Sequence, residues 1–328
     1  ERLHAPHAQL GQWWWVGWRA GGGGAHADCS VNLKKGPSGP FLIPMPHWQT
    51  ARFRIDLTAP QVMGIVNLTP DSFSDGGWHN TTQTALQHCE QLLLDGAQIL
   101  DIGGESTRPG SPTVSLDEEL ARVLPVVREA VKLGVPISVD TYKPQVMQAV
   151  LDLGADIIND VWALRQPGQS GQPGASQTVA AHPRCGICLM HMHRDPQTMQ
   201  TAPMQGDVVP QVLSFLELVE QNLKGLGVEK ARIVWDMGIG FGKTVEQNFS
   251  LLARQHELLA CGTPLLVGWS RKSSLGSVTG LAVQDRMVPS VAAALLAVER
   301  GARIVRVHDV RETVAALKVW NATISVAA

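Results

Sequence analysis

Short apolar segments alternate with longer segments of helical periodicity from residue 61 to the C-terminus, and this alternation constrains the fold more than any other feature of the chain. The apolar segments are rich in β-branched residues, which suits strands buried on both faces. The predicted strands cover residues 62–66, 98–102, 136–140, 157–161, 186–191, 232–236, 264–269 and 304–308.

Helical segments follow these strands, with apolar residues at helical spacing. They are predicted at residues 81–95, 116–133, 144–153, near Val179, and at 208–226, 246–260, 289–300 and up to Ile324. The crossover at residues 165–176 is irregular and rich in Gly and Pro, and Pro125 is expected to kink the second helix. Eight evenly spaced strand–helix units predict an α/β fold of the TIM (β/α)8 barrel type, whereas a doubly wound open sheet would rarely need eight.

The barrel is predicted to form a single domain over residues 56–328, preceded by an irregular N-terminal extension, residues 1–55. Within the extension, tryptophans crowd at residues 13–18, glycines fill residues 21–24, and neither a helical nor a strand period appears. We interpret this segment as disordered or non-native, with a Trp-rich partner-binding tail as the functional alternative. No signal peptide is expected, because no apolar stretch of suitable length precedes a small-residue cleavage site.

Composition excludes several classes of protein. A formal net charge of −2 and the absence of a basic tract argue against binding to nucleic acid or to an anionic membrane surface. Five cysteines, an odd number, argue against a disulfide framework and for a reducing compartment, so cytoplasm is expected. No apolar run approaches the ~20 residues of a membrane span.

Polar residues stand at the C-terminal end of each predicted strand, where a TIM barrel carries its catalytic groups. They are Asn67; Asp101 with the loop 105–110; Asp140; Asn159 and Asp160; His191 and His193; Asp236; Ser270, Arg271 and Lys272; and Arg306 with His308. The cations and Asn67 suit a phosphorylated anion, with Mg²⁺ as a candidate counter-ion. The carboxylates of Asp140 and Asp236 and the amide of Asn159 suit a flat heterocycle with N–H donors.

Two glycine-rich motifs fail at residues 238–244. A P-loop would need Gly where Met237 stands, and a dinucleotide fingerprint would need Gly where Lys243 stands. The segment is interpreted as a flexible loop that lets Phe241 and Lys243 approach a ligand.

Two further patterns have structural interpretations. Cys185, Cys188, His191 and His193 resemble a metal cluster, but strand residues three apart face opposite sides, so core cysteines are favoured over zinc or redox roles. The acidic run 117–119 is interpreted as a helix start capped by Ser115.

Eight motifs together resemble the dihydropteroate synthase family. MGIVNLTPDSFSDGG at 63–77 and ILDIGGESTRPGS at 99–111 are similar to its two pterin-binding signatures. The later motifs follow in order as SVDTYKP at 138–144, IINDV at 157–161, LMHM at 189–192, GIGFGK at 238–243, SRKS at 270–273 and RVHDV at 306–310. The resemblance extends from about Ala59 to the C-terminus.

The resemblance implies condensation of 6-hydroxymethyl-7,8-dihydropterin diphosphate with p-aminobenzoate, giving 7,8-dihydropteroate and diphosphate, in a sulfonamide-sensitive, homodimeric enzyme. It implies that the pterin is held by Asp140, Asn159, Asp236 and Lys272. It implies that Asn67 binds Mg²⁺ and the diphosphate. It also implies that Arg306 and His308 contact the diphosphate. The implied p-aminobenzoate pocket is formed by Thr107, Arg108, Pro109, Phe241, Lys272 and Ser273.

Some residues depart from the family pattern, and two other functions stay open. The family usually has Pro where Met237 stands, which could loosen that loop, and Trp269 is bulky beside the Ser-Arg-Lys motif. A pterin-dependent methyltransferase domain shares the pterin residues but needs no diphosphate site. A catalytically silent pterin-binding paralogue would be expected to lose a ligand residue, and none is lost.

Overall fold

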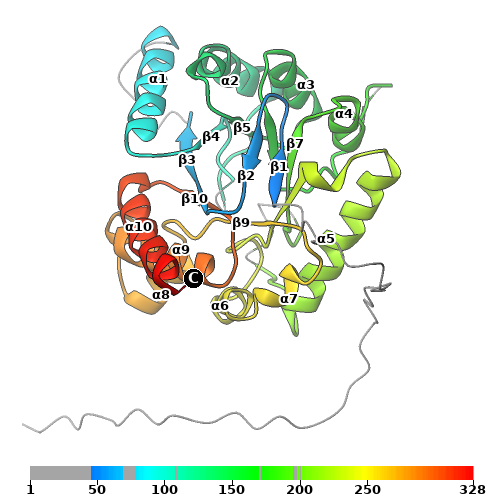
Figure 1. Ribbon diagram of the computed structural model, residues 1–328. Helices are drawn as coiled ribbons and strands as arrows, with labels where there is room; N and C mark the ends of the chain where they lie inside the picture. The colour runs from blue at the N-terminus through cyan, green and yellow to red at the C-terminus, as the bar shows by residue number, and fades with distance from the viewer. Residues whose placement is uncertain are drawn as a thin grey trace, which may run out of the picture. The chain divides into compact units, whose positions relative to one another are not determined.

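The computed structural model describes residues 46–68, 78–107, 110–169, 171–194, 198–199 and 201–327. Eight parallel strands form a closed barrel in the order β10-β3-β4-β5-β6-β7-β8-β9. Figure 1 shows the helices arranged around this barrel, which confirms the predicted TIM (β/α)8 fold. The barrel strands are β3 (Gln61–Asn67), β4 (Ile99–Gly103), β5 (Ile137–Asp140), β6 (Ile157–Asp160), β7 (Gly186–Met190), β8 (Ile233–Asp236), β9 (Leu265–Val267) and β10 (Ile304–Val307).

The helices and 3-10 turns follow the strands. They are α1 (Trp78–Leu94), α2 (Leu116–Ala130), η2 (Val131–Leu133), α3 (Pro144–Asp152), α4 (Ala175–Ala181), α5 (Val208–Gly225), η3 (Lys230–Arg232), α6 (Val245–Ala253), α7 (His256–Leu259), α8 (Ser273–Thr279), η4 (Val283–Asp285), α9 (Met287–Glu299) and α10 (Val310–Ala327). Helix α2 continues through Pro125. Its predicted cap is confirmed, because the Ser115 side chain accepts a hydrogen bond from the backbone N–H of Glu118 at 3.2 Å.

One helix prediction was wrong, and one short helix was missed. The single helix expected at 246–260 is two helices, α6 and α7, and the chain between them is held by the buried side chain of Gln255, whose amide donates to the carbonyls of Ala297 and Arg300 at 2.9 and 3.1 Å. The short helix α8 was not predicted, because its seven residues contain Gly and Ser and show little periodicity.

The barrel interior changes from apolar to polar in a single step of two residues along several strands. The inward positions nearest the N-terminal ends of the strands include Ile99, Ile157, Val234 and Ile304, all fully buried in one apolar cluster. Because side chains alternate between the two faces of a strand, the next inward position on each strand lies two residues further on. Those positions hold Asp101, Asn159, Asp236 and Arg306.

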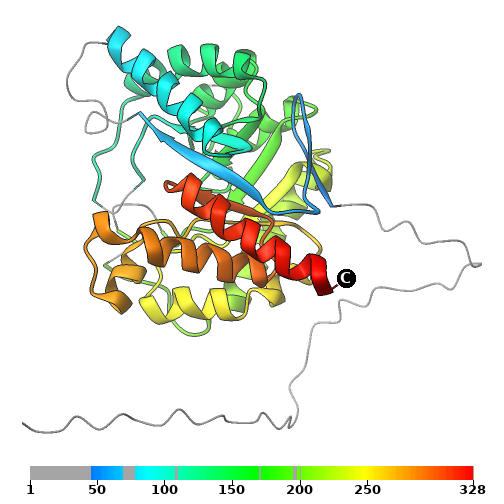
Figure 2. The same ribbon diagram turned by 60° about the vertical axis from the view of Figure 1, so that its left-hand side comes forward.

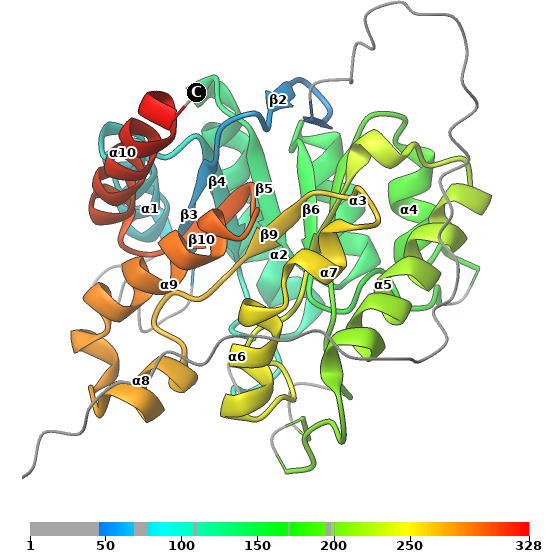
Figure 3. The ribbon, with the colours of Figure 1, turned by 60° about the horizontal axis from the view of Figure 1, so that its bottom comes forward.

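A β-hairpin closes the apolar end of the barrel. Strands β1 (His47–Gln49) and β2 (Arg54–Asp56) pair in antiparallel fashion. Trp48 is fully buried in the apolar cluster, and its indole N–H donates to the carbonyl of Arg232 at 2.8 Å. In the hairpin turn, Arg52 pairs with the buried carboxylate of Asp156 at 2.6 Å. Figures 2 and 3 show the hairpin at one end of the strands and α8 toward the other.

The hairpin corrects the predicted domain boundary at residue 55. Residues 46–55, assigned to the extension, belong to the barrel domain, because Trp48 and Ile55 pack against its inward side chains. Three-residue strands carry too little periodicity to be recognised in a sequence. The rest of the predicted extension, residues 1–45, lies outside the described residues.

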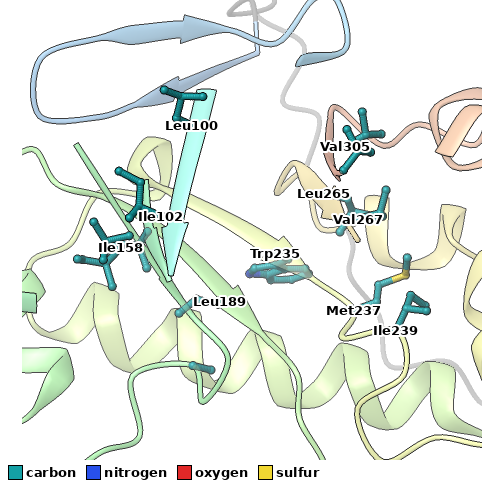
Figure 4. Close-up of a cluster of buried hydrophobic side chains, with 14 of the residues drawn as sticks. Leu100, Ile102, Ile158, Leu189, Trp235, Met237, Ile239, Leu265, Val267 and Val305 are labelled. Carbon is teal, nitrogen blue, oxygen red and sulfur yellow. The ribbon is translucent and has the colours of Figure 1, made fainter. Parts of the chain in front are cut away.

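The outward faces of the strands form a second core beneath the helices. Figure 4 shows several of these side chains, including Leu100, Ile158 and Trp235. Trp269 is buried there too and packs against Phe249 of α6 with ring centroids 5.2 Å apart, as expected for a bulky residue next to a helix. Among the described residues, no helix combines the length and apolar character needed to cross a bilayer.

Candidate active site

A cavity of about 810 Å³ opens at the C-terminal ends of the barrel strands, opposite the hairpin. Every described residue to which the family resemblance assigned a ligand lines this one cavity: Asn67, Thr107, Asp140, Asn159, Asp236, Phe241, Lys272, Ser273, Arg306 and His308. Of the other strand-end candidates, Asp101, Asp160, His191 and His193 are not part of its lining. Arg108 and Pro109 lie outside the described residues, as does the loop 69–77 of the first signature motif.

The centre of the cavity floor is a chain of charged groups. Arg306 of β10 bonds through Nε to the fully buried Asp101 carboxylate at 2.6 Å and through Nη2 to Asp140 at 2.9 Å. Asn159 donates from its side-chain amide to the same Asp101 oxygen at 3.2 Å. Arg306 is therefore oriented by two carboxylates, while its side chain is still 21% exposed.

Burial changes the protonation of the acids at this site. Loss of solvation raises the pKa of Asp140 to about 7, although the Arg306 guanidinium opposes the shift and favours the carboxylate. The pKa of Asp236 is also raised by burial, with a hydrogen bond from the backbone N–H of Gly238 at 2.7 Å acting in the opposite direction. Carboxyl groups with raised pKa values inside a cavity are typical of functional sites.

The polar groups face an apolar wall. Met190 and Val161, at the ends of β7 and β6, pack with Met199 and Phe241 in one buried cluster. The Phe241 ring also lies 4.3 Å from Lys272 Nζ, a cation–π arrangement. A flat ring bound between the carboxylates and this wall would meet hydrogen-bond acceptors of the protein at its edge and apolar side chains against its face.

The opposite side of the cavity carries more basic groups. Ser270 Oγ lies 3.0 Å from His308 Nδ1 and accepts from the backbone N–H of His308 at 3.1 Å. Arg271 is paired with Asp309 at 2.6 Å. This side suits an anion.

A buried ion network supports the stem of the loop after β4. Lys143 bonds to Glu105 and, at 2.5 Å, to the fully buried Glu119 of α2. Arg122 of α2 donates to the carbonyl of Gly104 at 2.8 Å. The network joins the second signature loop to α2 and to the SVDTYKP segment, which explains why charged residues stand in both.

Some predicted strand-end residues are structural. The Asp160 carboxylate accepts from the backbone N–H groups of Trp162 and Leu164 at 2.7 and 2.8 Å, and so shapes a turn in which Leu164 has a φ of 58°. Cys185, just before β7, and Cys188, within it, are buried in two different apolar clusters, which agrees with the prediction of core cysteines.

The prediction that Lys243 approaches a ligand was wrong. Its side chain is buried and bonds to backbone carbonyls and to His191 Nδ1 at 2.9 Å, and it is not part of the cavity lining. The predicted flexibility of its loop is not what the contacts indicate either, since those bonds fix the loop from within. His191 is likewise part of this internal arrangement and packs edge-on against Phe215 of α5.

Several lining residues were missed. Ile65 and Met190 could have been found by counting two residues along a strand from a buried inward position. Arg286 lies at the start of α9 and stacks over Gly276, where a Cβ would meet its guanidinium at 2.2 Å. No strand-end signal marks Arg286, because it reaches the cavity from a later helix.

Residues 63–308 match the sequence model of a family described as pterin binding enzyme. The chain belongs to this family.

Relatives place it more narrowly among the pterin-binding enzymes. The dihydropteroate synthase of Neisseria meningitidis serogroup B is 52% identical over 281 residues, 84% of this chain and 96% of the relative. A solved structure of Burkholderia cenocepacia dihydropteroate synthase complexed with 7,8-dihydropteroate is 49% identical, with a TM-score of 0.77 over 86% of this chain and 97% of that one. A Xanthomonas albilineans dihydropteroate synthase with 4-aminobenzoic acid is 47% identical, with a TM-score of 0.78 over 85% and 98%. The function of the present chain is therefore that of a dihydropteroate synthase, a transferase of folate synthesis.

Proposed function

We propose that the cavity condenses 6-hydroxymethyl-7,8-dihydropterin diphosphate with p-aminobenzoate, giving 7,8-dihydropteroate and diphosphate. The observation that carries the assignment of residues is the meeting of buried acceptors and cations in one cavity. Acceptors line its floor, and cations line the side near His308.

The pterin end of the site is assigned to Asp140, Asn159 and Asp236. Their oxygens accept from the amino and ring N–H groups of a pterin, and the wall of Met190 and Phe241 covers the ring face. Arg306 stands between Asp101 and Asp140, so it orients the Asp140 carboxylate that receives the pterin and also faces the diphosphate end.

The diphosphate end is assigned to Asn67, Arg306 and His308. As the C–O bond to the methylene group breaks, negative charge grows on the diphosphate and positive charge on the pterin-methylene unit. Arg306 and His308 stabilise the first, and the carboxylates of Asp140 and Asp236 stabilise the second. A charge-separated transition state is favoured by groups that are already held in place before the reaction. The ion pairs with Asp101 and Asp140 hold the Arg306 guanidinium in this way.

The p-aminobenzoate pocket is assigned to Thr107, Phe241, Lys272 and Ser273, with Arg108 and Pro109 contributing from the second signature loop. The amine attacks a cation-like carbon, so its position matters more than a strong general base. A sulfonamide, which has a similar aromatic amine, is expected to compete for this pocket.

We further propose that Mg²⁺ binds at Asn67 together with the diphosphate. Asn67 lies at the end of β3 and lines the cavity, and among the described residues no group of three or more His, Cys, Asp or Glu side chains is arranged to hold a metal alone. These facts fit an ion that takes one protein oxygen and completes its shell with phosphate oxygens and water. When bound, Mg²⁺ would neutralise charge on the departing diphosphate.

The alternatives predict different products. A methyltransferase domain would not need the cations near His308, and a silent paralogue would bind pterin without turnover. Formation of dihydropteroate therefore separates the synthase from both alternatives.

The test measures diphosphate release and dihydropteroate formation with Mg²⁺, with and without p-aminobenzoate, in the wild type, Asp236→Ala and Asp236→Asn. We expect both variants to lose about 10²–10³-fold in kcat, because each removes the charge facing the pterin-methylene unit. Asp236→Asn keeps an acceptor for the Gly238 N–H, so its loop stays in place, and Asp117→Ala on the exposed start of α2 is the matched control. A folded wild type that binds pterin but forms no product would instead identify the silent paralogue.

We also propose that the enzyme is a cytoplasmic homodimer. Val278 of α8, Val288 and Leu296 of α9, and Val319 of α10 are large apolar side chains that are 46–68% exposed on neighbouring helices. A second copy of the chain is the partner that would cover such a surface in a homo-oligomer. Sedimentation should show a dimer in the wild type and a monomer for Val288→Asp, and a monomeric wild type would contradict this proposal.

A further inference from the structure

The amine of Lys243 is enclosed by acceptors that belong to the protein itself. Lys243 is only 4% exposed, and Nζ donates to the carbonyl oxygens of Gly238 at 2.8 Å, Phe241 at 3.2 Å and His191 at 3.4 Å. A fourth acceptor is His191 Nδ1, at 2.9 Å. The amine is therefore a hydrogen-bond donor that is covalently attached to the loop it organises.

Three glycines allow the backbone of this loop to turn around the Lys243 amine. Gly238, Gly240 and Gly242 all have left-handed φ angles, of 66°, 83° and 71°. A Cβ on Gly238 would lie 1.8 Å from the His191 carbonyl oxygen, and one on Gly242 would lie 2.7 Å from His193 Cβ. The backbone therefore approaches the end of β7 closely, and this approach brings the carbonyls within reach of Lys243.

His191 is suited to receive a hydrogen bond from the amine. Burial and the neighbouring Lys243 lower the pKa of His191 to about 2, so its ring is neutral. The ring packs edge-on against Phe215 with centroids 5.0 Å apart, which fixes its orientation. The Lys243 amine thus joins the end of β7 to the loop after β8.

The outer side of the same loop faces the cavity. Ile239, Gly240 and Phe241 line it, and the Phe241 ring meets Lys272 Nζ at 4.3 Å. Lys243 holds the Phe241 carbonyl from inside, while Asn248 of α6 accepts from the Gly240 N–H at 2.8 Å. The backbone is thereby fixed on both sides of Phe241, at the Gly240 N–H and at the Phe241 carbonyl, and the Phe241 ring is held against Lys272.

We propose that Lys243 is a positioning residue for the p-aminobenzoate side of the cavity, which acts through the Gly238–Phe241 backbone on Phe241 and Lys272. This inference rests on the proposed function for the identity of the ligand. Lys243 does not line the cavity, and its amine acts as a donor to the loop.

The test compares Lys243→Ala with Lys243→Met, and adds n-propylamine to both. The Ala variant leaves a space that matches the three carbons and the amine that were removed, whereas Met fills the space with an apolar chain. We expect the KM for p-aminobenzoate to rise about 10–100-fold in both, because small misplacements of positioning groups have effects of this size. The dissociation constant for a pterin, measured by calorimetry, should change by less than about 3-fold, since Asp140, Asn159 and Asp236 belong to the strands β5, β6 and β8 and not to the loop.

Rescue provides the readout that a purely structural role would not give. n-Propylamine should lower the KM of Lys243→Ala saturably toward the wild-type value and leave Lys243→Met unchanged. Lys132→Ala, which removes an exposed lysine of η2, is the matched control. Its KM for p-aminobenzoate should equal the wild-type value, with or without n-propylamine.

Three outcomes with folded variants overturn the proposal. Folded Lys243 variants with wild-type KM values, equal weakening of pterin and p-aminobenzoate, or a loss in Lys243→Ala that n-propylamine does not relieve would each do so. If Lys243→Ala folds only with n-propylamine, the donor role is supported, and if neither variant folds under any condition, Lys243 is a folding residue instead. A wild type without turnover would contradict the proposed function, whereas direct titration of p-aminobenzoate would still decide the role of Lys243.

Discussion

At the hairpin end of the barrel, Trp48 covers a layer of fully buried apolar side chains, whereas two residues further along the same strands the inward positions hold Asp101, Asn159 and Asp236. The first layer is closed by a protein segment and contains few polar atoms. The second opens into a cavity of about 810 Å³ and contains paired charges. The same strands therefore serve stability at one end and chemistry at the other, and the two ends should respond differently to substitution.

The largest expected effect is at the closed end. Trp48→Ala should lower the free energy of unfolding by about 3–5 kcal/mol, because it leaves a cavity under the hairpin and an unpaired Arg232 carbonyl. At temperatures where the variant is folded, its kcat and KM should match the wild type. Thermal denaturation and steady-state kinetics measure both, and a large kinetic change would show that the two ends are coupled.

The next effect is at the boundary between the layers. Asp101→Asn removes the fully buried charge that faces Arg306 Nε and should destabilise the fold by about 3 kcal/mol, since the half-buried Arg306 guanidinium loses one of its two anionic partners. It should also lower kcat/KM for the pterin substrate, because Arg306 is no longer oriented. Chemical denaturation of this variant beside Asp117→Asn on the surface separates the local loss from a general effect of charge. Wild-type kinetic constants in Asp101→Asn would show that this residue serves stability alone, as the residues at the hairpin end do.

A smaller effect is expected from pH at the open end. The pKa of Asp140 is raised from 3.8 to about 7, so the folded protein binds more protons than the unfolded chain between these values. This group's contribution to stability is complete below pH 3.8 and is lost as the pH rises through 7. Pterin affinity should change in the opposite direction and increase about tenfold from pH 6 to pH 8, because the carboxylate is the form that accepts from pterin N–H groups.

Asp140→Asn provides the control for this pH effect. It should flatten both the stability and the affinity profiles over the same range, as measured by denaturation and calorimetry. Unchanged profiles in that variant would assign the titration to another group.

The smallest effect should fall outside both layers. Ser115→Ala removes the side-chain acceptor for the Glu118 N–H and should cost about 1 kcal/mol, with no change in kinetics. Denaturation in urea would measure it. A value near that of Trp48→Ala would mean that α2 contributes more to the domain than its cap contact suggests.

The sequence was most informative where neighbouring residues determine structure. Strand-end positions such as Asp140 and Asp236 were predictable, because in a parallel barrel the end of a strand is also the rim of the cavity. Ser115 was predictable because capping is local. The hairpin was not, since Trp48 is recognisable as part of a core only when the barrel that receives it is known. The roles of Arg286 and Lys243 also depend on the folded structure. Arg286 reaches the cavity from a distant helix, and Lys243 bonds to the backbone of its own loop.

The glycine-wound loop around Lys243 limits how this site can evolve. Three of its positions require left-handed backbone, and two of those have no room for a side chain. The lysine is tied to the carbonyls, so Ile239 and Phe241 are the positions of residues 238–243 at which a new side chain could reach the cavity without disturbing the turn. Changes in selectivity that arise in this segment should therefore be concentrated at two sites, and a library restricted to Ile239 and Phe241 would sample most of its usable variation.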